Sequence, residues 1–435
     1  MKKILFASAV VAAAAGLFAA RPDYWRANYD KSKIAPYTLE DPLTFVDGTK
    51  VATPADWARR RREILGIFAK EMFGQEPPAP ETVVIEKVEE GVTLAGFGIR
   101  RQYRMWFKAD KSGPAIDWLV LLPRWAKKPA LPIIFLNYGG NYELIRDKQV
   151  VVPDMWLRPA KKPAEVLRGR YEDMNSVEFV FPAHMILARG YALVTACYAQ
   201  VSPDVSPRAD GSLPEGSPSP WSGVFDLWPK RDPGRDDNTT SIGAWAWALS
   251  RGLDLAERIP EIDATKSVAT GCSRLAKTAL LAAARDERFA VCVPNQTGGG
   301  GVPLAKRDYG ENVSTEMNMF HHWYCKAYNK YVDNEQAMKF DQHLLVAAIA
   351  PRRILVQGFN SGWFDTKGEF LSCRAASPAW EFLGLPGLPA GDFPANYDTG
   401  RIGPYLGYVR RGGQHGICGY DWMWTLDFAD RAFKR

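Results

Sequence analysis

The feature that most constrains the fold of this chain is the alternation of short apolar segments with helical segments in its second half. Strands are expected at 192–198, 267–270, 290–294 and 353–357, and helices at 242–258, at 275–284 and after Asp421. Strands buried on both faces of a parallel sheet form continuous apolar runs, and the helices between them cover the two faces. The alternation therefore predicts an α/β protein with a mostly parallel sheet.

The first half of the chain is expected to extend this sheet. Apolar or alternating segments predict strands at 83–88, 98–107, 117–122 and 131–136. Before them, an amphipathic helix at 55–73 and a proline-rich stretch at 75–80 are expected to pack across the main sheet. The insertion at 202–233, rich in Pro, Gly, Ser and Trp, is expected to form an ordered surface loop near the functional site.

The N-terminus has the layout of a secretory signal peptide. Two lysines follow Met1, an apolar run extends from 4 to 20, and the polar Arg21 comes directly after it. The alternative is an uncleaved anchor, which would need about 20 apolar residues. We expect residues 1–20 to be a signal peptide and residues 21–435 to form a single catalytic domain, periplasmic or secreted, with no membrane association.

Composition supports a large globular body and excludes one class of partner. The chain is 46% hydrophobic, with 15 Trp, 17 Tyr and 21 Phe, which is enough for a large core. Its net charge of +6 is spread thinly, without the basic clusters that phosphate-backbone binding requires. We therefore expect no nucleic-acid partner, and a monomer.

The most informative segment is 267–277, in which a short apolar strand runs into Gly271-Cys272-Ser273 and then into a helix. This is the layout of a nucleophile elbow, which exposes the serine Oγ above a sheet and directs the next backbone N–H at a developing oxyanion. Leu275 stands where the general Gly-x-Ser-x-Gly pattern has glycine. The alternative is a serine that only caps the helix.

A serine nucleophile requires a base, and the chain has five histidines. His415 lies in a glycine-containing loop at 411–416, just before the last expected helix. A histidine near the C-terminus, after the serine, is the chain order of α/β-hydrolases. The others suit different places: His184 and His343 lie in apolar helical segments, and His321 and His322 flank Trp323 and are candidates to line a pocket.

Two features are candidates to stabilise an oxyanion. The glycine-containing turn at 137–141 follows an apolar strand, and such a turn exposes backbone N–H groups unless it is only a tight turn. Arg274 directly follows Ser273, where a guanidinium can stabilise negative charge; the alternative is a structural ion pair.

These residues resemble a known family. The segment 270–274 with Lys277 is similar to the Gly-x-Ser-Arg-x-Gly-Lys signature of the glucuronoyl esterases. Further segments that resemble motifs of that family, in the same order, are 137–141, 189–192, 244–247, 286–289, 350–352, 368–370, 413–416 and 420–422. The resemblance spans roughly 131 to the C-terminus and implies a three-layer α/β-hydrolase sandwich.

The resemblance also implies roles for single residues. It makes Ser273 the nucleophile, His415 the general base and Arg274 an oxyanion stabiliser, in a mechanism without metal or cofactor. Lys277 matches a contact to sugar hydroxyls, and Trp363 is similar to an aromatic residue that packs on the uronate ring. We place Gln296 with Lys277 and Trp363 among the substrate-binding residues.

The acid of a catalytic triad is missing from both positions where the family has it. One position reads Asn295-Gln296-Thr297-Gly298, and the segment before Trp363 reads Asn360-Ser361-Gly362, so Gln296, Ser361 and Gly362 are all neutral. The carbonyl of Gln296 can accept a hydrogen bond from His415 Nδ1–H and orient the imidazole without a charge. The nearest acids in sequence are Asp365 and Glu369, and Asp365 also resembles a structural aspartate of the family.

Six cysteines leave one structural question open. They have no metal-ligand spacing, and Cys272 and Cys418 flank the expected nucleophile and base. In an exported protein the two thiols either form a disulfide or remain buried and free.

The sequence thus predicts a serine carboxylic ester hydrolase acting on a glucuronate ester between glucuronoxylan and lignin. Two alternatives remain at this stage. One is a hydrolase of another sugar ester, acetyl or methyl, on the same fold. The other is a catalytically weakened carbohydrate-binding homologue, which the neutral acid positions would explain.

Overall fold

The computed structural model describes residues 27–153, 168–170, 172, 180–206, 212–395 and 399–434. The predicted signal peptide at 1–20 lies outside the described residues. So does the middle of the 202–233 insertion, at 207–211. Within the described ranges, no helix is long and apolar enough to cross a membrane.

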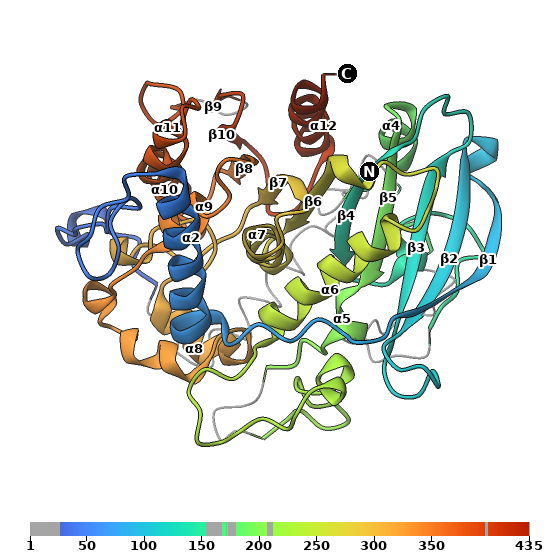
Figure 1. Cartoon of the computed structure of the whole chain (residues 1–435), viewed down its shortest axis with the longest axis horizontal. Coiled ribbons are helices and arrows are strands. Elements are labelled where there is room, and N and C mark those ends of the chain that lie inside the picture. Colours follow the sequence, from blue (N-terminus) through green and yellow to red (C-terminus); the bar gives the residue numbers. More distant parts are fainter. Residues whose placement is uncertain are drawn as a thin grey trace, which may run out of the picture.

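The described strands form one ten-stranded sheet, which runs from β1 on the right of Figure 1 to β9 and β10 on the left, in the order β1-β2-β3-β5-β4-β6-β7-β8-β10-β9. Their bounds are β1 Val84–Thr93, β2 Gly98–Trp106, β3 Ala115–Pro123, β4 Leu131–Asn137, β5 Tyr191–Cys197, β6 Ser267–Cys272, β7 Phe289–Asn295, β8 Arg353–Phe359, β9 Thr399–Ile402 and β10 Leu406–Arg411. From β5 to β10 neighbouring strands pair in parallel, whereas the pairs at the two edges are antiparallel. The expected α/β class with a mostly parallel sheet is confirmed.

Helices cover both faces of this sheet. Their bounds are α2 Pro54–Phe68, α4 Ala183–Ala188, α5 Tyr198–Val201, α6 Ser241–Ala256, α7 Arg274–Arg285, α8 Val313–Phe320, α9 Gln342–Ala347, α10 Thr366–Ala376, α11 Pro378–Phe382 and α12 Gly419–Phe433. α6 and α7 pack on one face over Ile134 and Ala269, and α4 and α12 pack on the other over Ile133 and Val268. The side chains alternate along β4 and β6, so each strand contributes to both cores.

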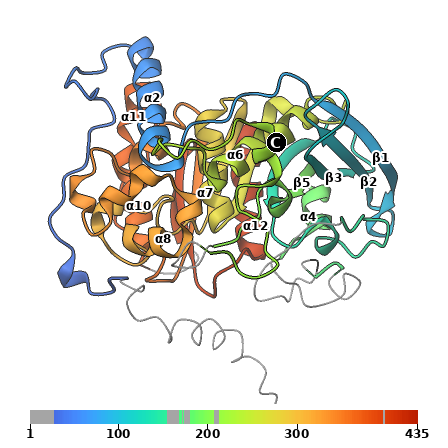
Figure 2. The same ribbon diagram turned by 90° about the horizontal axis from the view of Figure 1, so that it is seen from below.

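The helix at the N-terminal end packs on the outer helices rather than on the sheet itself. Trp57 Nε1 donates to Ala350 O over 3.4 Å, and Arg61 Nε donates to Ala348 O over 2.8 Å, both just after α9. Figure 2 shows α2 at the end of the molecule that holds α10 and α11, opposite β1 and β2. The proline-rich stretch then crosses α6 on its way to β1, where Trp247 Nε1 donates to Pro78 O over 3.0 Å. The expected packing across the sheet is therefore corrected: a helical layer lies between them.

The topology brings the carboxyl ends of the parallel strands to one edge of the sheet. Because β4, β6, β7, β8 and β10 are parallel, the loops that follow Asn137, Cys272, Asn295, Phe359 and Arg411 all leave the sheet at the same edge. In open α/β sheets this carboxyl edge is where ligands bind. The expected serine and histidine both lie in these loops.

Candidate active site

Ser273 stands at the turn between β6 and α7 in a strained conformation. Its φ of 59° and ψ of −130° are unusual for a residue with a side chain, and such a backbone costs about 1–3 kcal/mol. Ser273 N donates to Asn295 O over 2.9 Å, which ties the turn to the end of β7. The turn also requires Gly271, because a Cβ there would lie 2.2 Å from Leu275 O. This is the geometry that a nucleophile elbow needs.

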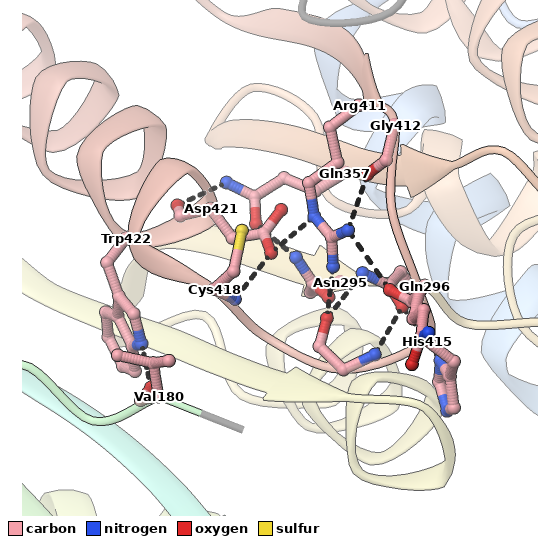
Figure 3. A network of polar contacts seen from close by, with 12 residues as sticks. Val180, Asn295, Gln296, Gln357, Arg411, Gly412, His415, Cys418, Asp421 and Trp422 are labelled. Carbon is pink, nitrogen blue, oxygen red and sulfur yellow. Dashed lines mark hydrogen bonds and ion pairs between the residues drawn. The ribbon is translucent and has the colours of Figure 1, made fainter. Parts of the chain in front are cut away.

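His415 lies in the loop between β10 and α12 and is held by Gln296, which directly follows β7. His415 Nδ1 is 2.8 Å from Gln296 Oε1, and Figure 3 shows the imidazole beside this amide. The same amide is bonded at both ends to one backbone residue: Gly416 N donates to Gln296 Oε1 over 3.0 Å, and Gln296 Nε2 donates to Gly416 O over 2.6 Å. Gln296 is fully buried.

These contacts determine the tautomer of the histidine. The N–H of Gly416 is only a donor and its carbonyl only an acceptor, so the amide of Gln296 has one orientation, with Oε1 toward His415. Nδ1 must then carry the proton, which leaves Nε2 as the acceptor. A neutral imidazole in this form is the one a general base requires.

The amide contacts also bear on where Gln296 belongs. Its side-chain oxygen and nitrogen are both occupied, by His415 and by the backbone of Gly416. These contacts place Gln296 behind His415 rather than among the substrate-binding residues.

The loop that presents His415 is folded around Arg411, the last residue of β10. Its guanidinium is buried and lies in the centre of Figure 3. It donates to the carbonyl oxygens of three loop residues, Gly412, Gln414 and Gly416. Arg411 Nε also donates to Asp421 Oδ2 over 2.8 Å, and Cys418 N donates to the same oxygen over 2.9 Å. The buried pair thus joins β10, the histidine loop and the start of α12.

The surroundings of His415 keep its imidazole neutral. Phe364 and Phe359 pack on the ring with centroid distances of 4.6 and 5.6 Å. Burial, followed by the positive charges of Arg274, Arg411 and Lys277, lowers the pKa of His415 to about 4. Among the described residues, no carboxylate contributes to this shift.

Arg274, the first residue of α7, makes the ion pair that the sequence left open as an alternative. Its Nη1 pairs with Asp204 Oδ2, and its guanidinium lies 4.8 Å from the centroid of the Trp323 ring. Burial opposes the charge of Arg274, but the Asp204 carboxylate together with Tyr198 and Tyr138 outweighs burial and raises the pKa of Arg274. Among the described residues, the buried Nε of Arg274 has no hydrogen-bond partner. A guanidinium held in this way keeps donor capacity for a ligand.

Lys277 lies one helical turn after Ser273 and is almost completely buried. Its Nζ is 3.4 Å from Glu311 Oε2 and 5.1 Å from the centroid of the Trp323 ring. Glu316, behind this pair, is fully buried, and burial raises its pKa well above the usual range. Trp323 therefore lies against both cations of the site, Arg274 and Lys277.

The segment after β8 carries two adjacent aromatic residues, Trp363 and Phe364, with different surroundings. Trp363 is half-buried, and its carbonyl accepts a hydrogen bond of 2.8 Å from Glu311 N, which places it next to the partner of Lys277. The ring that packs on His415 belongs to its neighbour Phe364. The sequence shows an aromatic pair here but not which ring faces the base.

The two acids that follow Trp363 are engaged elsewhere. Asp365 Oδ2 accepts a hydrogen bond of 2.8 Å from Arg307 Nε, which corrects its candidacy as a substitute acid. Glu369 is fully buried, and Thr297 Oγ1 lies 3.4 Å from its Oε1. Burial raises the pKa of Glu369 well above the usual range, which favours its protonated form. The residue on His415 Nδ1 is Gln296.

The turn after β4 is less open than its glycines suggest. Gly140 N donates to Asn137 Oδ1 over 2.9 Å, so this N–H is not available to a ligand. A Cβ on Gly139 would lie 1.8 Å from Glu143 Oε2, so the side chain of Glu143 requires glycine at 139. Tyr138 OH donates to Cys272 O over 2.6 Å and holds the turn against the elbow.

All six cysteines are described, and all are free. The disulfide between Cys272 and Cys418 is not formed: the Cys418 side chain instead accepts a hydrogen bond from the backbone of Asp421 at the start of α12. Within the described ranges, no cluster of His, Cys, Asp and Glu is suited to hold a metal ion.

Comparison with known proteins gives consistent matches. A family model described as fungal glucuronyl esterase matches residues 225–384, a range that includes Ser273 and Gln296. The carbohydrate esterase MZ0003 of an unknown prokaryotic organism is 32% identical over 414 residues, which cover 93% of this chain and 91% of that protein. The 4-O-methyl-glucuronoyl methylesterase 1 of Wolfiporia cocos is 32% identical over 366 residues, 80% of this chain and 72% of that protein. A solved structure, the glucuronoyl esterase from Solibacter usitatus, has a TM-score of 0.83 and 33% identity, covering 93% of this chain and 100% of its own.

Proposed function

Because the chain belongs to the glucuronoyl esterase family of carboxylic ester hydrolases, we propose that it cleaves a glucuronate ester joining glucuronoxylan to a lignin alcohol, by a serine mechanism. The observation that carries the proposal is the fixed tautomer of His415. Gln296 Oε1, 2.8 Å from Nδ1, leaves Nε2 unprotonated in a loop at the same edge of the sheet as the elbow that presents Ser273.

The reaction proceeds through an acyl-enzyme. Ser273 Oγ attacks the uronate carbonyl while His415 Nε2 takes its proton, and the tetrahedral intermediate collapses when the same proton passes to the departing alcohol. Water then attacks the acyl-enzyme by the reverse sequence and releases the uronate and free Ser273. Each proton taken by Nε2 makes an imidazolium, which Gln296 stabilises through its amide dipole alone.

The oxyanion is stabilised by Arg274 and by the first turn of α7. The guanidinium follows the nucleophile directly, and its buried Nε–H has no acceptor among the described residues. The N-terminus of α7 adds positive potential at the same place. Lys277, buried beside Glu311, is the proposed contact to the sugar hydroxyls, with Trp363 against the uronate ring.

The neutral Gln296 also supports a second candidate, a carbohydrate-binding protein with little turnover. Replacing the triad acid of a serine protease by an amide costs about 10⁴ in kcat, chiefly because the amide selects the wrong histidine tautomer. Here the backbone of Gly416 holds the amide the other way round, so that Oε1 accepts from Nδ1. The tautomer part of the loss is thereby avoided, which favours the esterase over the binding protein.

The test is hydrolysis of benzyl glucuronate, with an acetylated xylose as the competing ester and Ser273→Ala as the blank. The proposal predicts turnover of the glucuronate ester by the wild type and none by the variant. Turnover of the acetyl ester alone would assign the enzyme to other sugar esters. If the wild type and Ser273→Ala were equally inert while both bound xylan oligomers, the binding protein would replace the esterase.

We further propose that residues 1–20 direct export and that residues 21–435 act as one monomeric catalytic domain in the periplasm or outside the cell. Mass spectrometry of the secreted protein would locate the new N-terminus. A mass that retains residues 1–20 would contradict cleavage.

A further inference from the structure

Asp204, from the described start of the 202–233 insertion, is a buried carboxylate beside the proposed oxyanion site. Its side chain is 1% exposed. Four donors from three segments of the chain converge on it: Tyr198 OH, Arg274 Nη1, and His322 Nε2 with Trp323 Nε1. The proposed mechanism assigns Asp204 no role, and nothing in the sequence distinguishes it from the other acids of the insertion.

The carboxylate is saturated in a way that fixes each partner. Oδ1 accepts from His322 Nε2 and from Trp323 Nε1, each over 2.8 Å, while Oδ2 accepts from Arg274 and, over 3.1 Å, from Tyr198. An ionised carboxylate only accepts hydrogen bonds, so the facing nitrogen of His322 must carry a proton. Among the described residues each oxygen thus has two donors, and the guanidinium of Arg274 is held against a carboxylate that is itself fixed by several bonds.

Trp323 extends this arrangement to the second cation. Its ring lies 4.8 Å from the Arg274 guanidinium and 5.1 Å from Lys277 Nζ, while its Nε1–H is held by Asp204. Stacking on an aromatic face restricts an arginine side chain that would otherwise have many rotamers. One buried carboxylate therefore orients a cation and the ring that lies against both cations.

We propose that Asp204 is a positioning residue for catalysis: together with His322 and Trp323 it aims the Arg274 guanidinium at the oxyanion. This inference rests on the proposed esterase function. The direction in which kcat changes distinguishes it from a simple effect of charge, because the negative charge of Asp204 by itself weakens the positive potential at the oxyanion. If charge alone mattered, removing it would raise kcat; if orientation matters, kcat falls.

The test is a double-mutant cycle between Asp204 and Arg274, measured as kcat and KM for benzyl glucuronate. Asp204→Asn removes the charge and turns an amide N–H₂ toward two donors in either orientation, so it weakens the hold on Arg274 without changing the volume of the side chain. Removing one oxyanion donor lowers kcat by about 10²–10³-fold. We expect Asp204→Asn to produce part of this effect, a fall in kcat of roughly tenfold or more, with little change in KM. In the Arg274→Ala background the same substitution should change kcat by less than about twofold, because the group that Asp204 aims is gone.

Three further variants make the cycle decisive. The control is Asp427→Asn on α12, which makes the same substitution at an exposed carboxylate paired with Arg189. It should leave kcat unchanged. Trp323→Phe keeps a ring against the cations and removes only the Nε1–H that Asp204 accepts. If Asp204→Asn does not fold, Trp323→Phe takes its place in the cycle. It should lower kcat by a smaller factor, and this loss should again disappear in the Arg274→Ala background. Ser273→Ala establishes that the measured turnover belongs to the proposed site.

The outcomes separate the two hypotheses. A loss in kcat that disappears in the Arg274→Ala background supports positioning by Asp204. Equal losses in both backgrounds, or a rise in kcat, would overturn this inference and leave the esterase function intact. If the wild type showed no turnover beyond that of Ser273→Ala, the proposed function would be overturned, and this inference with it.

Discussion

The two sides of Ser273 are built on opposite electrostatic plans. On the base side, His415 Nδ1 meets the neutral amide of Gln296, and no carboxylate shifts its pKa. On the oxyanion side, Arg274 meets the buried carboxylate of Asp204. The buried negative charge that a serine hydrolase usually places behind its histidine stands here behind its arginine.

The difference teaches that orientation and charge are separable contributions of a third residue. Gln296 orients the imidazole and fixes its tautomer through the backbone of Gly416, but it adds no charge. Asp204 orients the guanidinium and partly neutralises it. On this account both sides are organised chiefly for geometry, in line with the large catalytic share of preorganised groups.

The largest effect is expected from Ser273→Ala, which removes the atom that both sides serve. Loss of a triad member leaves only the binding and oxyanion contributions, so kcat should fall by about 10⁴-fold or more. Hydrolysis of benzyl glucuronate measures this, and circular dichroism checks the fold. A folded variant that retained wild-type turnover would remove Ser273 from the mechanism.

The next effect tests the charged side. Arg274→Ala should lower kcat by about 10²–10³-fold, the cost of one oxyanion donor. Arg274→Lys retains a charge but not the fork that pairs with Asp204, so it should recover only part of the loss. Equal activity of the alanine and lysine variants, at the wild-type level, would show that Arg274 is only a structural ion pair.

The neutral side is tested by a pair of substitutions at Gln296. Gln296→Ala removes the acceptor that orients His415, and kcat should fall by about 10²-fold, within the range of general-base contributions. Gln296→Glu adds a charge. It also turns a carboxylate oxygen toward Gly416 O, which in the wild type accepts a hydrogen bond of 2.6 Å from Gln296 Nε2. An unmet contact of this kind costs about 1–3 kcal/mol, so we expect kcat to change by less than about tenfold.

A large gain in kcat for Gln296→Glu would contradict the idea that the site is built for an amide at position 296. An increase well beyond tenfold in kcat would show that position 296 is simply a lost acid, and that the amide contributes no more than a placeholder.

The smallest effect concerns pH. His415 acts as a base only when neutral, and its pKa is lowered to about 4 by burial and by three cations, so kcat/KM should fall only as the pH drops through about 4. In Gln296→Glu a neighbouring carboxylate favours the imidazolium, so the acid limb should move to higher pH. Profiles of kcat/KM against pH for the two proteins measure the shift. A wild-type limb near the ordinary histidine pKa of about 6.5 would contradict the neutral site.

Much of the fold followed from local pattern. Apolar runs marked most strands of the sheet to within a few residues, and β6 was expected at 267–270 and extends over Ser267–Cys272. β9 and β10 were missed, because Leu406–Arg411 is short and glycine-containing and gains its apolar environment from β8 and α10, which are distant in sequence. The elbow was recognisable because strand, glycine, serine and helix are consecutive in the chain.

The contacts of the site required the tertiary structure. Gln296 meets His415 across 119 positions and Asp204 meets Arg274 across 70, so no local pattern reports either pair. Asp365 was a candidate acid by its place in sequence, yet Arg307 pairs with it. The packing of Phe364 on His415 was likewise not predicted, because the direction of a side chain after a strand depends on what packs around it.

The sequence by itself determined the α/β class, the elbow at Ser273 and the place of His415, the proposed base, in a loop near the C-terminus, because those features arise from residues adjacent in the chain. Only the tertiary structure decided which groups flank them: a neutral amide behind His415 and a carboxylate behind Arg274. The reason is physical. The parallel sheet gathers loops from distant strands at one edge, and the pairings there are set by packing and hydrogen-bond satisfaction rather than by spacing along the chain.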